Sequence, residues 1–276
     1  MRNQPIGVMD SGVGGLTVVS EIWRQLPREE ILFYGDSARC PYGDRPAAEI
    51  AEFTFRALDF LVEQRVKMLV IACNTATAVC LDWARERYDI PVLGVIAPGA
   101  RAAIAATTNQ RVGIIGTHAT ISSNSYPRAL HLTHRGIATV PVACPRFVSI
   151  VEQGLTASAE VLPVVADSLR EFSDANIDTL ILGCTHYPLL ASAIGQVMGP
   201  SVTLINSAEE TARDISFVLA DQQMTRTHMT EPNHVFLTSG DAGAFADIGA
   251  RWLGRAIAVS RHDVWECGEC FDAAGG

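Results

Sequence analysis

MLVIACNT, at residues 68–75, and LILGCTH, at residues 180–186, each place a cysteine just after an apolar run. An apolar run of this length is typical of a buried strand in a parallel sheet. The change to polar residues marks the carboxyl end of the strand, where open α/β sheets bind their ligands. We therefore expect Cys73 and Cys184 to lie at two ligand-binding edges.

Each cysteine strand is preceded by a glycine-bearing strand that ends at a hydroxyl residue. IGVMDSG at residues 6–12 ends at Ser11, and VGIIGTH at residues 112–118 ends at Thr117. The separation from hydroxyl to cysteine is nearly the same in both halves. This repetition predicts an α/β fold of two similar open lobes with mainly parallel sheets, and an active site in the cleft between them.

Strand and helix patterns alternate along the rest of the chain. A turn at Ala97-Pro98-Gly99, before a helix from Ala100 to Ala106, places the lobe boundary after residue 97. The first lobe is then discontinuous, 1–97 with 207–276, and the second covers 98–206. Further strands are predicted at 31–34, 91–96, 138–142, 202–205 and 235–238, and helices at 47–65, within 157–176, from Ser207 (capped by Ser207 with Glu210 in a capping box) and at 242–253.

Composition narrows the class of protein. With 276 residues, 48% of them hydrophobic and 18% charged, the chain is expected to be soluble and globular. A net charge of −9 argues against a nucleic-acid partner, because such proteins concentrate Lys and Arg. No apolar stretch approaches the ~18 residues of a membrane span and no signal-peptide pattern opens the chain, which predicts a cytoplasmic protein without a membrane partner.

The seven cysteines are an odd number, which predicts reduced thiols rather than a disulfide framework. Most buried cysteines only pack, so Cys40, Cys80 and Cys144 are interpreted as structural. No cofactor is expected, because the glycines at 12, 14 and 15 lack the spacing of a nucleotide-binding loop. No metal is expected either, because His262, Cys267 and Cys270 are three ligands where structural zinc requires four.

Six motifs in order resemble those of glutamate racemase, in the cofactor-independent aspartate/glutamate racemase superfamily, and the resemblance extends over residues 6 to about 254. They are DSGVGG at 10–15, PYG at 41–43, CNT at 73–75, GT at 116–117 with Thr120, VEQG at 151–154 and GCTHYP at 183–188. The resemblance implies an isomerase that supplies D-glutamate for peptidoglycan synthesis, and a homodimer.

The resemblance implies that one cysteine thiolate removes the Cα proton of glutamate and the other thiol delivers a proton to the opposite face. Each group must be a base for one enantiomer and an acid for the other. The family pattern places Asp10 and His186 beside the thiols as assisting catalytic groups, with Glu152 near His186. It assigns the first cysteine to the D-enantiomer.

A free thiol with a pKa of ~8.5 is mostly protonated at neutral pH. We expect both strands to lead into helix N-termini, whose N–H groups and dipole would lower the pKa of Cys73 and Cys184.

The substrate brings two carboxylates to an acidic chain whose motifs hold no Lys or Arg, apart from the flanking Arg39 and Arg45. Neutral donors are therefore expected to bind it, with Asp10 on the ammonium group. By the resemblance the substrate-binding residues are Asp10, Ser11, Tyr42, Gly43, Asn74, Thr75, Thr117, Thr120, Thr185 and His186. Thr-His after Cys184 favours glutamate over aspartate, whereas Asp44-Arg45-Pro46 departs from the family pattern and leaves the loop contacts open.

Three alternatives stay open. Another amino-acid or hydantoin racemase would share the fold and the two thiols. A thiol–disulfide protein would use Cys73 and Cys184 as a redox pair. A non-catalytic binding protein, for example one that binds DNA gyrase, would not need these thiols. Assays of the enantiomers of glutamate, aspartate and hydantoins without added cofactor distinguish these classes.

Overall fold

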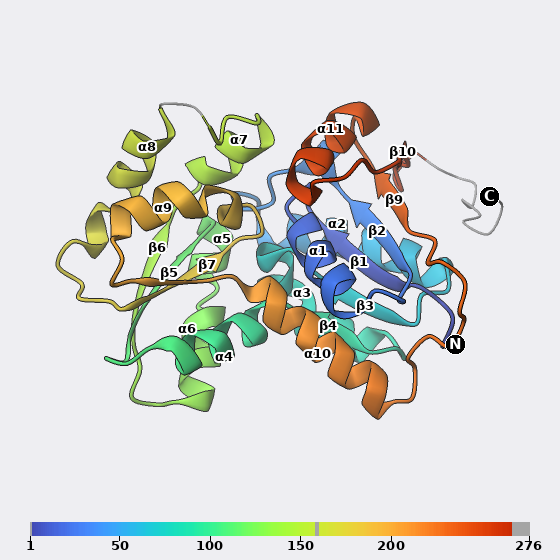
Figure 1. The fold of residues 1–276 in the computed structure, drawn as a ribbon, viewed down its shortest axis with the longest axis horizontal. Coiled ribbons are helices and arrows are strands. Elements are labelled where there is room, and N and C mark those ends of the chain that lie inside the picture. The colour runs from blue at the N-terminus through green and yellow to red at the C-terminus, as the bar shows by residue number, and fades with distance from the viewer. Residues whose placement is uncertain (1, 158–159, 267–276) are drawn as a thin grey trace.

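The computed structural model describes residues 2–157 and 160–266, and within these ranges it contains two parallel sheets, drawn on the right and left of Figure 1. The six-stranded sheet has the order β10-β9-β2-β1-β3-β4 and the four-stranded sheet the order β6-β5-β7-β8. The strands are β1 (Ile6–Asp10), β2 (Ile31–Gly35), β3 (Met68–Ile71), β4 (Val92–Gly94), β5 (Arg111–Gly116), β6 (Ala138–Ala143), β7 (Thr179–Gly183), β8 (Thr203–Ile205), β9 (Val235–Thr238) and β10 (Val259–Arg261). The predicted α/β class with two parallel-sheet lobes is confirmed.

Helices cover both faces of each sheet (Figure 1). They are α1 (Leu16–Gln25), α2 (Ala47–Glu63), α3 (Asn74–Arg87), α4 (Ile96–Ala106), α5 (His118–Ser122), α6 (Ser125–Thr133), α7 (Arg146–Glu152), α8 (Val161–Ser168), α9 (Ala191–Met198), α10 (Ser207–Asp221) and α11 (Ala242–Leu253). Short 3₁₀ helices are η1 (Ser37–Arg39), η2 (Arg170–Phe172) and η3 (Tyr187–Leu190).

The apolar runs are continuous because each strand is buried on both faces. In β3, Met68 and Val70 pack with residues of α1 and α10, whereas Leu69 and Ile71 pack with residues of α2 and α3. Side chains alternate between the faces of a strand, so a strand covered on both sides must be apolar at every position. This is the physical origin of the pattern at residues 68–71.

The connections leave β1 and β3 in opposite directions. From β1 the chain crosses through α1 to β2 on one side, and from β3 it crosses through α3 to β4 on the other. The helices α1 and α3 pack on opposite faces of the sheet. Strands that diverge in this way leave a crevice between their carboxyl ends, and open α/β sheets bind ligands there.

The smaller sheet repeats the arrangement with β5 and β7. From β5 the chain passes through α6 to β6, and from β7 through α9 to β8, again over opposite faces. The carboxyl ends of β5 and β7 therefore form a second crevice. The two strands that precede the cysteines, β3 and β7, each border such a crevice. Their partners across it are β1, which leads to Ser11, and β5, which leads to Thr117.

The chain crosses from the first sheet to the second through α4 and returns through α10, and an ion pair between Arg101 and Asp214 joins these helices. The turn predicted at Ala97-Pro98-Gly99 is wrong, because α4 already begins at Ile96. Proline is tolerated in the first helical turn, where no backbone partner is needed, and Gly99 N–H already donates to the carbonyl of Val95. The predicted lobe boundary falls inside this helix, and the lobe division stays a prediction.

Two other local predictions are wrong. Helix α10 is capped by Asn206, whose side chain accepts from Ala208 N–H at 3.1 Å, so Ser207 is the first helical residue. Adjacent residues of the capping type explain the shift by one position. The long helix predicted within 157–176 is a short α8 followed by η2. At its end Ser168 Oγ donates to the carbonyl of Val164 at 2.8 Å, and such side-chain bonds compete with helix continuation.

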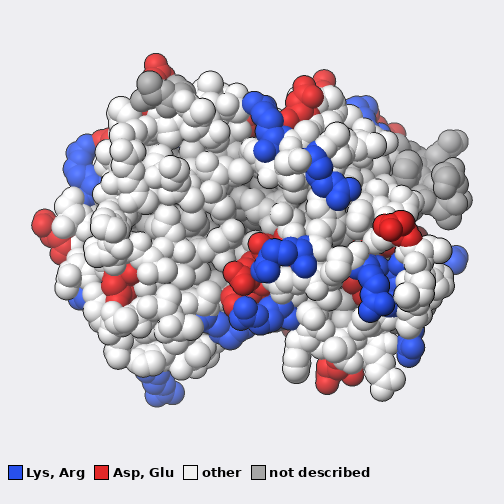
Figure 2. All heavy atoms as spheres, in the orientation of Figure 1, with Lys and Arg blue, Asp and Glu red and all other residues white. Residues whose placement is uncertain are grey.

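On the face drawn in Figure 2, acidic and basic side chains lie close to one another over the lobe of the first sheet and near the middle of the molecule. None of the helices in the described ranges combines the length and apolar character needed to cross a membrane.

A buried ion pair at the amino end of the first sheet joins four parts of the chain. Lys67 Nζ donates to Glu29 Oε2 at 2.5 Å, and also to the carbonyls of Arg2 and Met224 at 2.9 Å each. The second oxygen of Glu29 accepts from Arg226 N–H at 2.8 Å. Lys67 and Glu29 are both buried, so neither charge has water as an alternative partner.

Lys67→Met is expected to lower the free energy of unfolding by about 3–5 kcal/mol, because it leaves the Glu29 carboxylate buried without its cation. Urea-induced unfolding would measure the loss. Arg24→Met is the matched control, since Arg24 is solvent-exposed and its pair with Glu21 is expected to contribute far less to stability. Equal losses for the two variants would contradict the assignment.

Candidate functional site

Cys73 directly follows β3 and caps helix α3. Its Sγ accepts from Ala76 N–H at 3.5 Å and lies 3.5 Å from Ser11 Oγ, which follows the neighbouring strand β1. Asp10, the last residue of β1, accepts from Gly12 N–H at 3.0 Å. Asp10, Ser11 and Cys73 are therefore brought together at the crevice of the first sheet, where the sequence placed them.

Cys184 follows β7 at the crevice of the second sheet. Its Sγ lies 3.6 Å from Nδ1 of His186, and Nε2 of that ring lies 2.5 Å from Glu152 Oε1. Glu152 is the last residue of α7. The expected helix N-terminus after Cys184 is wrong, because a turn leads only into the short η3, which starts at Tyr187. The group beside the Cys184 sulfur is therefore the His186 ring, where N–H groups of a helix start were expected.

The two crevices face each other and are joined by hydrogen bonds. Thr185 Oγ1, from the second sheet, donates to Asp10 Oδ1, from the first, at 3.2 Å. The first loop also comes very close here, since a Cβ on Gly14 would lie 2.7 Å from His186 Nδ1 and collide with Thr185. A glycine is required at residue 14 because any side chain would push the two loops apart.

Three threonine hydroxyls meet across the same junction. Thr75 Oγ1, from α3, lies 2.8 Å from Thr117 Oγ1 and 3.2 Å from Thr120 Oγ1. Thr117 and Thr120 are 3.1 Å apart and belong to the start of α5. Gly43 packs against them, since a Cβ there would lie 2.5 Å from Thr117 Cβ. Hydroxyls both donate and accept, so this cluster can bind an anion by rotating its protons.

Asn74 adds an amide donor next to Cys73. Its Oδ1 accepts from Tyr126 OH at 2.7 Å, and its buried Nδ2 has no hydrogen-bond partner. A buried donor without a partner is costly and is often retained for a ligand. Tyr126 orients this amide, and nothing in its sequence context distinguishes it from a core tyrosine.

The loop that carries Tyr42 is held by charged residues from within the first lobe. Tyr42 OH donates to Asp36 Oδ2 at 2.6 Å, and Arg39 binds Asp36 at 2.8 Å. Arg39 also binds Asp263, after β10, at 3.0 Å. The sequence identified Tyr42 as a ligand contact, whereas its hydroxyl is bound to Asp36, and the supporting aspartates were missed because no local pattern connects residues 36 and 263.

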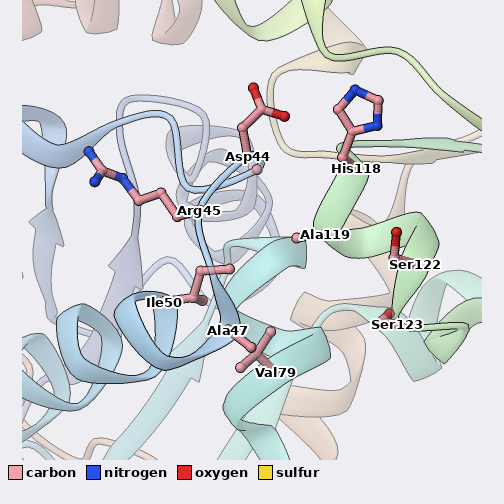
Figure 3. A pocket seen from close by; sticks show the side chains of 10 residues that line it. Asp44, Arg45, Ala47, Ile50, Val79, His118, Ala119, Ser122 and Ser123 are labelled. Carbon is pink, nitrogen blue, oxygen red and sulfur yellow. The ribbon is translucent and has the colours of Figure 1, made fainter.

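Both flanking arginines have carboxylate partners, which leaves the neutral hydroxyl and amide groups as the anion donors beside Cys73. Arg45 pairs with Glu49 at 3.1 Å and donates to the carbonyl of Arg39, also at 3.1 Å. Figure 3 shows Arg45 directed away from His118, on the wall of a cavity of about 600 Å³. This cavity lies between the Asp44-Arg45-Pro46 loop and α5, and Gly43 belongs to both the cavity wall and the threonine cluster.

Burial governs the charge of the groups around Cys73. It raises the pKa of Asp10 to about 6, against the lowering effects of His186 and of the Gly12 N–H group. Burial, together with the negative charge of Asp10, also raises the pKa of Cys73 to about 12. The hydrogen bonds with Ser11 and Ala76 N–H lower the Cys73 pKa without offsetting burial. The expectation that the helix start brings this pKa toward neutrality is wrong, because desolvation is the larger effect.

The histidine beside Cys184 favours its charged form, unlike Asp10 and Cys73. Burial alone would lower the pKa of His186, but hydrogen bonds to Cys184 and Glu152 raise it well above its usual range. Burial alone would likewise raise the pKa of Glu152, yet the hydrogen bond from His186 lowers it. The pair is therefore an imidazolium and a carboxylate, with the positive ring facing the Cys184 sulfur.

Cys40 is a third thiol at the site. Its Sγ donates to Glu152 Oε1 at 3.6 Å, on the side of the carboxylate that His186 also binds. The sequence interpreted Cys40 as structural. Its position next to the PYG motif at 41–43 was the one available signal. Cys267 and Cys270 lie outside the described residues.

Comparison with known proteins identifies the relatives of this site. The model of the Asp/Glu/Hydantoin racemase family matches residues 6–215. A glutamate racemase of Exiguobacterium sibiricum is 50% identical over 259 residues, which are 94% of this chain and 96% of the relative. Two solved structures are also similar. Glutamate racemase RacE1 of Bacillus anthracis has a TM-score of 0.92 at 47% identity and covers 95% of this chain and 98% of its own. The Francisella tularensis enzyme in complex with D-glutamate has a TM-score of 0.89 at 34% identity, covering 96% and 99%.

The raised pKa of Asp10 predicts how stability depends on pH. The folded state holds this proton up to about pH 6, while the usual Asp pKa is 3.8, so the carboxyl favours folding at low pH and that contribution is lost as the pH rises through 6. Asp10→Asn removes this effect. We expect the stability of the variant relative to the native chain to increase by about 2 kcal/mol between pH 4.5 and 7.5, measured by urea unfolding.

Asp178→Asn is the control of opposite sign. Hydrogen bonds from Thr107, Thr108 and Asn109 overcome a burial effect that would raise the pKa of Asp178, and they lower it. Because both the folded and the usual pKa of this carboxyl lie below about 4, the stability of Asp178→Asn relative to the native chain should change only at lower pH and stay level between pH 4.5 and 7.5. A relative stability of Asp10→Asn that does not change with pH would show that Asp10 is ionised throughout.

Proposed function

The chain belongs to the Asp/Glu/Hydantoin racemase family, and we propose that it interconverts L- and D-glutamate by proton exchange at Cα, with Cys73 acting on one face and Cys184 on the other. It is an isomerase, and the relatives that match almost its whole length are glutamate racemases. The observation that supports the two-thiol mechanism is the position of the thiols. Each follows a crevice strand of one sheet, and the Asp10–Thr185 hydrogen bond joins the two crevices.

In this mechanism one thiolate removes the Cα proton, so the C–H bond breaks and an S–H bond forms. The electron pair stays on the substrate as a carbanion conjugated with its carboxylate. The opposite thiol then donates its proton to the other face of Cα and becomes a thiolate. The products are the mirror-image amino acid and a site with the two protonation states exchanged, so the reverse reaction needs no further step.

The two thiols reach the thiolate state by different means. We propose that His186 stabilises the Cys184 thiolate, because its Nδ1 lies 3.6 Å from the sulfur and Glu152 orients the ring from the other side. Cys73 has no cationic side chain within hydrogen-bond distance in the described residues. The substrate ammonium, bound by Asp10, would supply a positive charge there and lower the pKa of Cys73 when it is needed.

Neutral groups would bind the two substrate carboxylates. The buried amide of Asn74 offers an unused Nδ2 donor, and Ser11 supplies a hydroxyl beside Cys73. The threonine cluster supplies further hydroxyls on the other side of Cys73, with the backbone of Gly43 against it. Such donors hold an anion without adding a fixed positive charge that would bind substrate and carbanion alike.

The biological setting is also a proposal. Following the family, we propose that the D-glutamate serves peptidoglycan synthesis and cell shape, that the enzyme is cytoplasmic, and that it forms a homodimer. We also propose the division into 1–97 with 207–276 and 98–206, since the strands of the first sheet lie within 6–94 and 235–261 and those of the second within 111–205.

Cys73→Ser and Cys184→Ser are each expected to reduce racemisation by several orders of magnitude with the fold retained. A serine hydroxyl is a far weaker acid than a thiol, so near neutral pH it neither forms the anion that removes the Cα proton nor readily donates its own proton. Circular dichroism of the amino acid and loss of the α-proton NMR signal in D₂O would follow the reaction. Cys80→Ser is the matched control, because Cys80 is a fully buried thiol of α3 away from the crevices. Turnover near the native value in either catalytic variant would overturn the mechanism.

His186→Gln tests the asymmetry between the thiols. The equilibrium constant between enantiomers is one, so kcat/KM must fall by the same factor in both directions. The family assigns Cys73 to the D-enantiomer and therefore Cys184 to the L-enantiomer. The variant should then slow mainly the step in which Cys184 removes the Cα proton of L-glutamate. We expect the primary isotope effect with α-deuterated substrate to increase for L-glutamate and to change less for D-glutamate. The reverse pattern would assign His186 to the other thiol.

A further inference from the structure

Three side chains of different chemistry meet beside the catalytic cleft. The atoms Cys40 Sγ, Glu152 Oε1 and His186 Nε2 all lie within 4.8 Å of one another. They come from three separate parts of the chain: the loop after η1, the end of α7 and the turn after β7. In the part of the chain that the structure describes, no other group of three such ligands is this close together.

The distances are near those that a tetrahedral zinc ion requires. With zinc at about 2.3 Å from sulfur and about 2.0 Å from nitrogen and oxygen, neighbouring ligand atoms are about 3.3–3.5 Å apart. Cys40 Sγ and Glu152 Oε1 are already 3.6 Å apart. His186 Nε2 and Glu152 Oε1 are 2.5 Å apart and must separate by less than about 1 Å. The Glu152 side chain is 25% exposed, so it has room to rotate.

We propose that Cys40, Glu152 and His186 form a binding site for zinc or a similar divalent transition metal, and that metal bound there inhibits the racemase. Thiolate, carboxylate and imidazole are the ligands that zinc takes in proteins, and three of them leave the fourth position open. The metal replaces the thiol proton of Cys40 and the proton between His186 and Glu152. Two anionic ligands then balance its charge.

Inhibition follows from the contact that the metal removes. His186 Nε2 is bound by Glu152 in the structure, and this hydrogen bond orients Nδ1 toward Cys184. A metal on Nε2 takes the place of that bond and ties the ring to the Cys40 loop instead. Metal binding itself does not depend on the proposed catalytic role of His186, whereas inhibition does, and the two are measured separately.

The experiment uses the full-length, reduced protein in which Cys267 and Cys270 are replaced by serine, because that pair could also bind metal through its two thiols. Cobalt(II) is the probe for binding. One equivalent should give the charge-transfer absorption of a cobalt–thiolate bond and the visible bands of a four-coordinate site. Cys40→Ser should abolish the charge-transfer band, while the matched control Cys144→Ser, a buried thiol outside the group, should retain it.

Zinc inhibition is measured on the same proteins, each relative to its own metal-free activity. Changes to residues that merely support a ligand already cost about 10–100-fold in metal affinity, so Cys40→Ser should raise the zinc concentration for half-inhibition by more than about tenfold. Cys144→Ser should not, and a chelator should restore activity. A cobalt band that survives Cys40→Ser but not Cys73→Ser or Cys184→Ser would overturn the proposal, because the catalytic thiols would be the site. Cobalt binding without zinc inhibition would overturn only the inhibitory role.

If Cys40→Ser does not fold, alkylation of the native protein decides the question. Zinc should slow the modification of Cys40 by iodoacetamide, located by mass spectrometry, and leave the rate at Cys144 unchanged. Equal rates at Cys40 with and without zinc would refute the site.

Discussion

The two parallel sheets meet at the carboxyl ends of their strands. Polar side chains that follow these strands form the junction. Asp10 accepts from Thr185 across this junction, and Thr75 contacts Thr117 and Thr120. Each sheet is apolar on both faces because helices cover it, so polar groups can gather only at strand ends. The divergence of the connections at β1/β3 and at β5/β7 opens a crevice in each sheet at this level.

The surroundings of the two thiols differ in whether hydrogen bonds offset the effect of burial on charged groups. Around Cys73 it disfavours charge, and the pKa of both Cys73 and Asp10 is raised. Around Cys184 the imidazole of His186 and the carboxylate of Glu152 form a buried hydrogen-bonded pair that tolerates charge. The proposed two-base reaction would thus use two chemically different halves. The substrate ammonium would complete the half that has no cation of its own.

The same geometry explains why a third thiol matters. Cys40 contacts the oxygen of Glu152 that His186 also binds, so the carboxylate connects the Cys40 loop to the catalytic half-site. That loop is held in turn by Asp36, Arg39 and Asp263, which come from parts of the chain far apart in sequence. A ligand that pulls on Cys40 therefore acts directly on the partner of Cys184.

Taken by itself, the sequence determined the strands, their burial on both faces, the duplication and the two cysteines at strand ends, because each of these follows from a local periodicity or a repeated motif. Sequence-based prediction failed at Ala97-Pro98-Gly99 and at Ser207, because residues suited to a turn or a cap are also accepted in the first turn of a helix. Within 157–176 it failed in the other direction, because the helix ends early at Ser168, whose side chain bonds to the carbonyl of Val164. The tertiary structure alone decided the contacts between distant residues: the hydrogen bond of Asp10 with Thr185, the one between Asn74 and Tyr126, and the approach of Cys40 to Glu152. It also decided the pKa of Cys73, because desolvation depends on everything packed around a sulfur, while a helix start seen in the sequence gives only one of the opposing effects.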